Sequence, residues 1–117
     1  MMYTTVCGMD NKRAKKIISE DNIQVLEVKD VIYVESEGHY LHIYMVEGKI
    51  IIRSKVKEFL DGIEEIFLHS HQSFAVNMAY IKKFGSNEIE LKDGRKIPIS
   101  RSKFKESKEK LIKYLEN

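Results

Sequence analysis

Two histidines in the stretch HSHQSFAVN, which covers residues 69–77, are spaced as metal ligands can be. Because alternate side chains of a β-strand point to the same face, His69 and His71 could bind one metal ion together. No Asp or Glu follows His71 within the next sixteen residues, and the remaining histidines, His39 and His42, lie about thirty residues away. The third ligand is therefore missing nearby, so a metal-binding β-barrel enzyme is kept only as the alternative hypothesis.

Other catalytic chemistry finds little support. Ser70, Ser73 and Ser100 are not framed by the glycine-rich elbow that exposes a nucleophilic serine. The six glycines stand singly, so no phosphate-binding glycine loop is present. We therefore predict no enzymatic activity and no cofactor.

Polar residues that can read nucleic acid gather where strands are expected to end. Side chains on loops of a rigid sheet can enter a DNA groove. Arginine can bind guanine, and glutamine adenine, through two hydrogen bonds. Serine, histidine and lysine suit phosphate oxygens. The segments concerned are His39-Tyr40, His71-Gln72-Ser73 and Ser100-Arg101-Ser102-Lys103.

The charges are unevenly distributed, although the net charge is only +2. From Glu20 to Glu37 there are six acidic residues and one lysine, whereas from Lys82 to Lys105 there are eight basic residues and three acidic ones. A basic C-terminal third is typical of a surface that meets a phosphate backbone. Solvated faces of ordinary proteins produce similar blocks, so charge alone leaves both interpretations open.

Length and composition indicate one domain of 117 residues. The longest apolar runs are far shorter than a membrane span or the apolar part of a signal peptide, so we expect no membrane association and a cytoplasmic location. The single cysteine, Cys7, fits a reducing compartment. Because it lies in an expected N-terminal tail, we predict that it is not a catalytic nucleophile.

Short runs of β-branched and aromatic residues, separated by turn signals, predict an antiparallel β-protein. A serine-capped helix is expected over 54–67, because apolar residues recur there at steps of three and four. Asp93-Gly94 predicts a hairpin, and Pro98 places the last strand at a sheet edge. A second helix should begin at Arg101 or Ser102. The expected strands are 15–20, 23–28, 31–36, 39–46, 49–53, 67–77, 80–84, 88–92 and 95–100.

Four segments follow one another in a characteristic order: YVESEGHYLHIY, IIIRSKVKEFLDGI, FLHSHQSFAVNMAYIKKF and IELKDGRKIPISRSKFKE. This order resembles the LytTR family of bacterial DNA-binding domains, the output modules of many response regulators. The likeness covers about residues 15–115. Its most specific part is H-x-S-F-x-V-N followed by the Asp-Gly hairpin and I-P-I-S-R.

The resemblance implies a mostly β, elongated, antiparallel multi-sheet fold with one short helix between sheets and a C-terminal helix. It also implies sequence-specific binding of double-stranded DNA, with loops entering successive major grooves. The contacts it implies are His39, Tyr40, Gln72 and Arg101 to bases, and His71, Ser73, Ser102 and Lys103 to the backbone. Asn77 would stabilise a turn, while His69 and Ser70 would be packing or solvent positions.

Further expectations concern organisation and partners. Residues 1–14 would be a tail or residual linker, and 15–117 the DNA-binding domain. The partner would be promoter DNA carrying direct repeats, with a homodimer forming on the DNA. In this family a receiver domain usually precedes the module, and only some fourteen residues do so here, which leaves open an excised domain or a stand-alone regulator.

Overall fold

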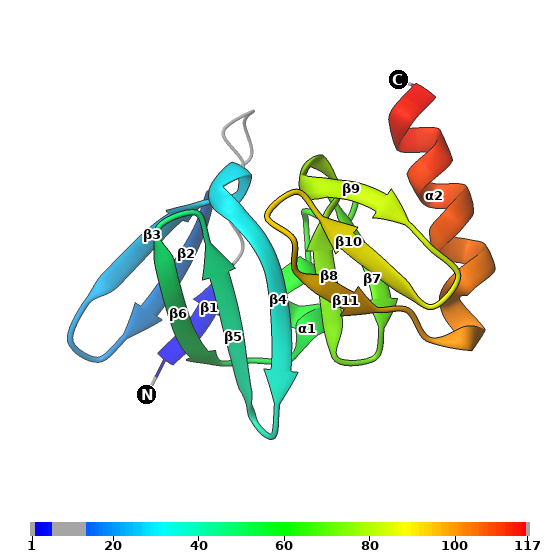
Figure 1. The fold of residues 1–117 in the computed structure, drawn as a ribbon. Coiled ribbons are helices and arrows are strands. Elements are labelled where there is room, and N and C mark those ends of the chain that lie inside the picture. The colour runs from blue at the N-terminus through cyan, green and yellow to red at the C-terminus, as the bar shows by residue number, and fades with distance from the viewer. Residues whose placement is uncertain (1, 6–13, 117) are drawn as a thin grey trace.

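The chain folds into three antiparallel sheets and two α-helices, described by a computed structural model for residues 2–5 and 14–116 (Figure 1). Its extents of 43 × 32 × 24 Å make it elongated. The N-terminal sheet has the order β1-β2-β3, with β1 at Met2–Thr5, β2 at Ala14–Ser19 and β3 at Ile23–Glu27. The C-terminal sheet has the order β11-β10-β9, with β9 at Ile81–Phe84, β10 at Glu88–Leu91 and β11 at Lys96–Pro98.

A five-stranded central sheet lies between these two and has the order β6-β5-β4-β8-β7. Its strands are β4 at Val31–Glu37, β5 at Tyr40–Met45, β6 at Gly48–Arg53, β7 at Phe67–His71 and β8 at Phe74–Asn77. Helix α1 (Val56–Leu60) joins β6 to β7, and α2 (Phe104–Glu116) ends the described chain. Single turns of 3-10 helix occur at η1 (Val28–Asp30), η2 (Met78–Tyr80) and η3 (Arg101–Lys103).

Each face of the central sheet buries its own core, as strand alternation requires. Leu41 and Ile43 of β5 face a core shared with the N-terminal sheet and α1, whose Phe59 is completely buried. Leu68 and Val76 face the other core, shared with the C-terminal sheet and α2. Each fully buried aliphatic side chain contributes about 1.5–3 kcal/mol, so both outer layers are held mainly by apolar contact.

An arginine on the β10–β11 hairpin fastens the C-terminal sheet to the central one. The guanidinium of Arg95 lies 5.4 Å from the ring centre of Tyr33 and 5.6 Å from that of Tyr44. These two rings are stacked, with centres 4.4 Å apart. Burial raises the pKa of Tyr33, and a hydrogen bond to Arg95 opposes that rise. The tyrosine therefore stays neutral and packs as an aromatic surface for the cation.

The mostly β fold with a short helix and a C-terminal helix is confirmed, but the first helix is shorter than the expected 54–67. It covers only Val56–Leu60, because Asp61 leaves the helical conformation and Gly62 follows with φ of +86°. Ile63 remains fully buried from the turns that follow, which explains the helix-like apolar spacing. The expected serine cap is wrong. Ser54 donates to the carbonyl of Lys55, and the carboxylate of Glu58 accepts the Lys55 N–H.

The single strand expected over 67–77 is also wrong, since β7 and β8 form a hairpin with Gln72 and Ser73 as its turn. Part of the expected tail is strand as well. Met2–Thr5 pair with β2 in register from Met2↔Ser19 to Thr5↔Lys16. The sequence Tyr-Thr-Thr is of a kind that favours a strand. Cys7 lies outside the described residues.

Several turn and edge predictions are confirmed. Asp93 and Gly94 connect β10 to β11, Gly94 has φ of +95°, and Pro98 lies on an edge strand. Asn77 stabilises a turn, because its Oδ1 accepts the Ala79 N–H at 2.9 Å and its Nδ2 donates to the Val31 carbonyl at 2.9 Å. No helix in the described part of the chain is long and apolar enough to cross a membrane.

Replacing Asn77 should be costly, because the residue is 2% exposed and its side chain satisfies the buried Val31 carbonyl and the Ala79 N–H. We expect Asn77→Ala to lower the free energy of unfolding by about 2–4 kcal/mol, since one donor and one acceptor lose their partners. Urea denaturation measures the change. Asn87→Ala, at an exposed position in the β9–β10 turn, is the matched control and should change stability by less than about 0.5 kcal/mol. Equal losses in both variants would contradict this role.

Candidate nucleic-acid interface

Two tight hairpin turns lie side by side at one end of the central sheet. Glu37 pairs with Tyr40, which leaves Gly38 and His39 as the β4–β5 turn. His71 pairs with Phe74, which leaves Gln72 and Ser73 as the β7–β8 turn. Because β4 and β8 are antiparallel neighbours, with Glu35 opposite Phe74, both turns project from the same end (Figure 1).

A hydrogen bond joins the bases of these two turns. The Ser36 N–H donates to the Ser73 carbonyl at 2.8 Å, so the β4–β8 pairing continues to the base of the second turn. Gly38 adopts φ of +63°, which a side chain other than glycine would rarely accept. The positions of His39 and Gln72 relative to one another are thus fixed by main-chain bonds.

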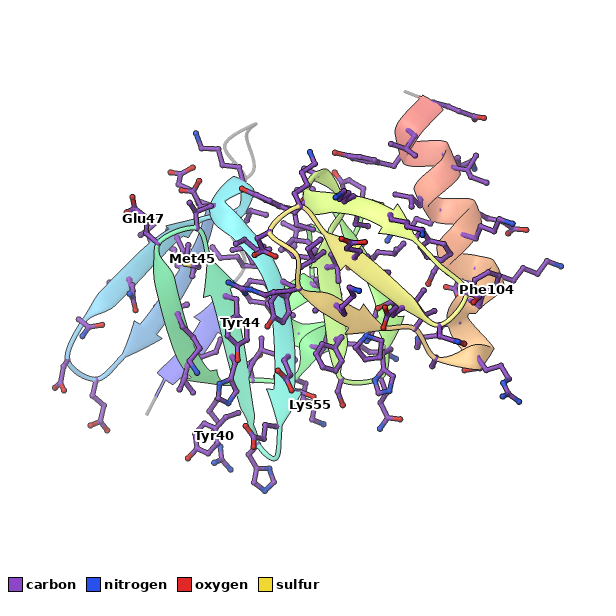
Figure 2. The ribbon with its side chains drawn as sticks, in the orientation of Figure 1. Tyr40, Tyr44, Met45, Glu47, Lys55 and Phe104 are labelled. Carbon is purple, nitrogen blue, oxygen red and sulfur yellow. The ribbon has the colours of Figure 1, made fainter. Side chains whose placement is uncertain are left out.

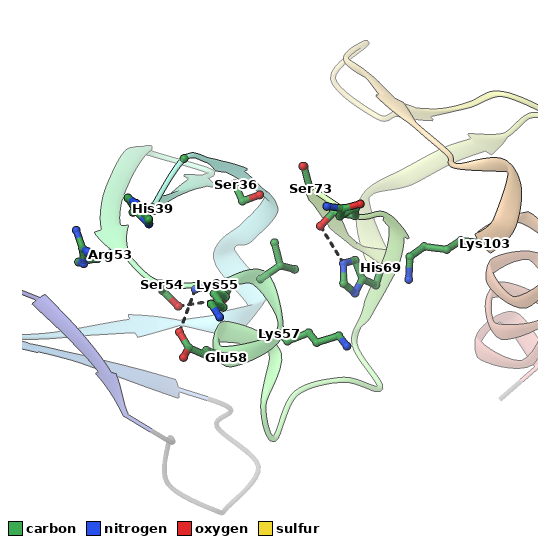
Figure 3. A pocket seen from close by; sticks show the side chains of 13 residues that line it. Ser36, His39, Arg53, Ser54, Lys55, Lys57, Glu58, His69, Ser73 and Lys103 are labelled. Carbon is green, nitrogen blue, oxygen red and sulfur yellow. Dashed lines mark hydrogen bonds between the residues drawn. The ribbon is translucent and has the colours of Figure 1, made fainter.

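A cleft of about 770 Å³ opens between the two turns and α1 (Figure 3). Figure 3 shows His39 and Arg53 on one side, His69, Ser73 and Lys103 on the other, and the start of α1 between them. The lining residues come from four parts of the chain: Ser36, Gly38, His39, Arg53, Ser54, Lys55, Val56, Lys57, Glu58, His69, Gln72, Ser73 and Lys103.

The cleft is basic, with four cationic side chains and one carboxylate among its lining residues. Arg53 ends β6, Lys55 and Lys57 lie at the start of α1, and Lys103 lies in η3. The carboxylate, Glu58, accepts the Lys55 main-chain N–H at 3.0 Å. A concave surface with an excess of one sign of charge concentrates the field, and the cationic side chains here outnumber the carboxylate, so this cleft should attract anions.

His69 lines the cleft in a half-buried position. Burial lowers the pKa of its imidazole, and the positive charges of Lys103, Lys57 and Lys110 lower it further. Its Nε2 lies 3.5 Å from the Gln72 carbonyl, a contact that acts in the opposite direction. Burial and the nearby lysines thus both favour the neutral imidazole.

The cleft brings together half of the expected contact residues. His39, Gln72, Ser73 and Lys103 line it, and Gln72 is exposed at its turn. Four others lie outside its lining: Tyr40, His71, Arg101 and Ser102.

These four differ in how they are exposed. Tyr40 begins β5 with 49% exposure beside the first turn, where Figure 2 labels it, and it pairs with Arg53. Arg101 and Ser102 are exposed in η3, next to Lys103. His71 is engaged within its own turn, because its Nδ1 accepts the Ser73 N–H at 3.1 Å.

Sequence reasoning missed the cations on the far side of the cleft. Arg53, Lys55 and Lys57 lie between the acidic and the basic blocks of the sequence, so a comparison of those blocks passes over them. His69, expected to be a packing or solvent position, lines the cleft. The signal available was the basic run RSKVK where the sixth strand meets α1, which places cations beside the turns only once the sheet order is known.

The histidine pair does not form a metal centre in the geometry described. A register shift between Leu68 and His71 interrupts the alternation of β7, and each of the two rings contacts the main chain of the turn. Among residues 2–5 and 14–116 no group of three His, Cys, Asp or Glu side chains could hold a metal ion. The metal-enzyme alternative is not favoured.

Fold and cleft together define a β-rich domain that presents polar hairpin turns beside a basic cleft. The chain belongs to the LytTR family, because the family model described as the LytTr DNA-binding domain matches residues 21–112. A solved LytTr DNA-binding domain of a Bacillus cereus response regulator has a similar fold. Its TM-score is 0.68 at 21% identity, over 85% of this chain and 95% of that one.

The relatives with curated names are bacterial regulators. The chain is 35% identical over 102 residues to the sensory transduction protein LytT of Bacillus subtilis, covering 78% of this chain and 40% of that protein. It is 31% identical over 105 residues to LytT of Enterococcus faecalis, covering 81% and 42%. An uncharacterized response regulatory protein of Vibrio cholerae is also 31% identical, over 91 residues, covering 70% and 35%. The chain thus spans about two-fifths of the length of these relatives.

The environment of His69 predicts a distinctive titration. Its NMR midpoint should lie below 6.5, and Lys103→Ala should raise it, because one repelling charge is removed. As the pH falls below 6.5, the imidazole of His69 binds a proton in the unfolded chain before it does so in the folded protein. The contribution of His69 should therefore lower the free energy of unfolding between pH 6.5 and the pKa of His69 in the folded protein. Lys83→Ala, on β9, is the control and should leave the midpoint unchanged. A midpoint at or above 6.5 in the wild type would refute this description of the cleft.

Proposed function

We propose that the chain is a sequence-specific double-stranded DNA-binding module of a transcriptional regulator, and that it is not an enzyme. Membership of a family of DNA-binding domains supports DNA binding. The observation that carries the specific form of the proposal is the basic cleft between two exposed hairpin turns. Turns on a rigid sheet supply side chains for base edges, and the cations around them supply phosphate contacts.

The division of labour follows from the chemistry of the side chains. Gln72, at a turn, suits adenine N6 and N7, and Arg101 in η3 suits guanine O6 and N7. His39 and Tyr40, at the other turn, are the remaining proposed base contacts. His71, Ser73, Ser102 and Lys103 are proposed backbone contacts, to which the cleft adds Arg53 and Lys57.

Size and charge are consistent with reading along the duplex. The longest dimension of 43 Å exceeds the pitch of about 34 Å that separates successive major grooves on one face of B-DNA. We propose that the turn residues and η3 enter neighbouring major grooves, and that two copies occupy direct repeats, forming a homodimer only on DNA. Response regulators of this family carry a receiver domain, and we propose that such a domain would control formation of the dimer in the cell.

The direct test is fluorescence-anisotropy binding to a randomised duplex pool in EDTA, at low and moderate salt, followed by sequencing of the retained duplexes. We expect salt-sensitive binding that enriches a repeated motif. Binding that requires added zinc, or no binding even at low salt, would reject the proposal and return His69 and His71 to consideration as metal ligands.

Removing a proposed base contact should change sequence preference. Gln72→Ala should cost about 1–3 kcal/mol on the selected duplex and relax preference at one base position, because two hydrogen bonds to a base edge are lost. Repeating the selection with the variant measures this. Asn87→Ala, an exposed amide away from the cleft, should retain the wild-type motif. An unchanged motif with Gln72→Ala would remove Gln72 from the interface.

Removing a proposed phosphate contact should act on all sequences alike. Lys57→Ala should weaken binding to selected and random duplexes by a similar factor and reduce the slope of log affinity against log salt by about one. Lys92→Ala removes an equal charge from the exposed β10–β11 hairpin, away from the cleft lining. If both variants reduce the slope equally, the cleft is not where the backbone lies.

A further inference from the structure

A fully buried serine hydroxyl links the hairpin carrying Gln72 to the segment carrying Arg101. We infer that Ser70 is a positioning residue, which sets the distance between these two reading elements without contacting DNA itself. The inference deepens the proposed function and rests on it. It also gives a role to a residue that sequence reasoning left as a packing or solvent position.

Two hydrogen bonds carry the inference. Ser70 is 0% exposed, and its hydroxyl donates to the carbonyl of Pro98 at 3.0 Å. Its own carbonyl accepts the N–H of Ser100 at 2.8 Å. Ser70 of β7 therefore binds Pro98, the last residue of β11, through its side chain, and Ser100, two residues further on, through its main chain. These contacts span about thirty residues of sequence.

The place of β7 in the sheet makes these bonds available. Leu68 pairs with Val76 and His71 with Phe74, so the register shifts between them, and Ser70 lies within this irregular stretch. β7 is also an edge strand of the central sheet, so its outer side faces no further strand of that sheet. The Ser70 carbonyl accepts the N–H of Ser100, which lies outside that sheet. An aliphatic side chain at this place would leave the Pro98 carbonyl without the hydroxyl.

The two hydrogen bonds of Ser70 lie close in sequence to both proposed base-reading residues. Ser70 precedes Gln72 by two residues, and Ser100 precedes Arg101 by one. The Ser100 carbonyl in turn accepts the N–H of Lys103 at 3.0 Å. The turn of η3 therefore begins at the residue that is bonded to Ser70. A shift at Ser70 would be transmitted to both Gln72 and Arg101 with little chain between them to absorb it.

Binding measurements can distinguish a variant that misplaces the reading residues from one that loses charge or stability. Base contacts depend on geometry to within a fraction of an ångström, whereas phosphate attraction falls off slowly with distance. Ser70→Ala removes no charge. It should therefore lower the ratio of affinities for selected and random duplexes about tenfold, while the salt slope on random DNA remains that of the wild type.

The experiment compares wild type, Ser70→Ala and Ser70→Cys on a duplex selected from a random pool by the wild type. Ser70→Cys fills the site with a slightly larger side chain but offers only a weak thiol donor, so its affinity ratio should fall between the other two. Amide hydrogen exchange gives a readout without DNA. The Ser100 N–H should exchange about tenfold faster in Ser70→Ala than in the wild type, relative to the N–H groups of β5.

Two controls isolate the effect. Ser107→Ala makes the same substitution at another buried serine, on α2, and Ile17→Val removes one methyl group from the opposite core. Both should retain the wild-type affinity ratio and Ser100 exchange. If Ser70→Ala weakens binding to both duplexes equally, or leaves the ratio and the exchange unchanged, Ser70 has no positioning role. If the wild type binds neither pool, the proposed function itself fails, and this role with it.

Discussion

The double pairing of β4 is the constraint on which the interface depends. β4 bonds to β5 on one side and to β8 on the other, and Val31 to Val34 are buried. Since the register of both pairs is set by residues that cannot be moved to solvent, a slip of one position would expose the core. The two hairpin turns inherit that register. Their separation is therefore a property of the core, and it is independent of whatever the turns contact.

Repulsion among the cations that line the cleft lowers the stability of the protein when no anion is bound. Four cations surround the cleft, and the pKa of His69 is lowered by burial first and then by the charges of nearby lysines. Like charges held in a concave surface repel one another and reduce stability. The two cores on either side of the central sheet offset that cost. An anion placed in the cleft would relieve the repulsion, so the arrangement favours a charged partner before any specific contact is considered.

Sequence patterns predicted which strands and helices exist better than where each one begins and ends. Period-two runs located most strands, and Asp93-Gly94 located a hairpin, because these signals are local. The helix expected over 54–67 failed because Ile63 reaches the core from turns, which mimic helical spacing. The cleft could be anticipated only in part. Gln72 and Lys103 carry suitable chemistry on their own, but Arg53 and Lys57 join them through sheet order, which no local pattern encodes.

The proposed function assigns affinity and recognition to separate parts of the fold. Arg53 and Lys57 belong to β6 and α1, whereas His39 and Gln72 occupy turns whose side chains contribute little to either core. On that proposal, a substitution in a turn would alter the base preference and leave the charge of the cleft unchanged. The η3 segment is the exception. Ser70 bonds to Pro98 and Ser100 just before this segment, so on the proposed function a change at Ser70 would affect recognition through the interior of the protein.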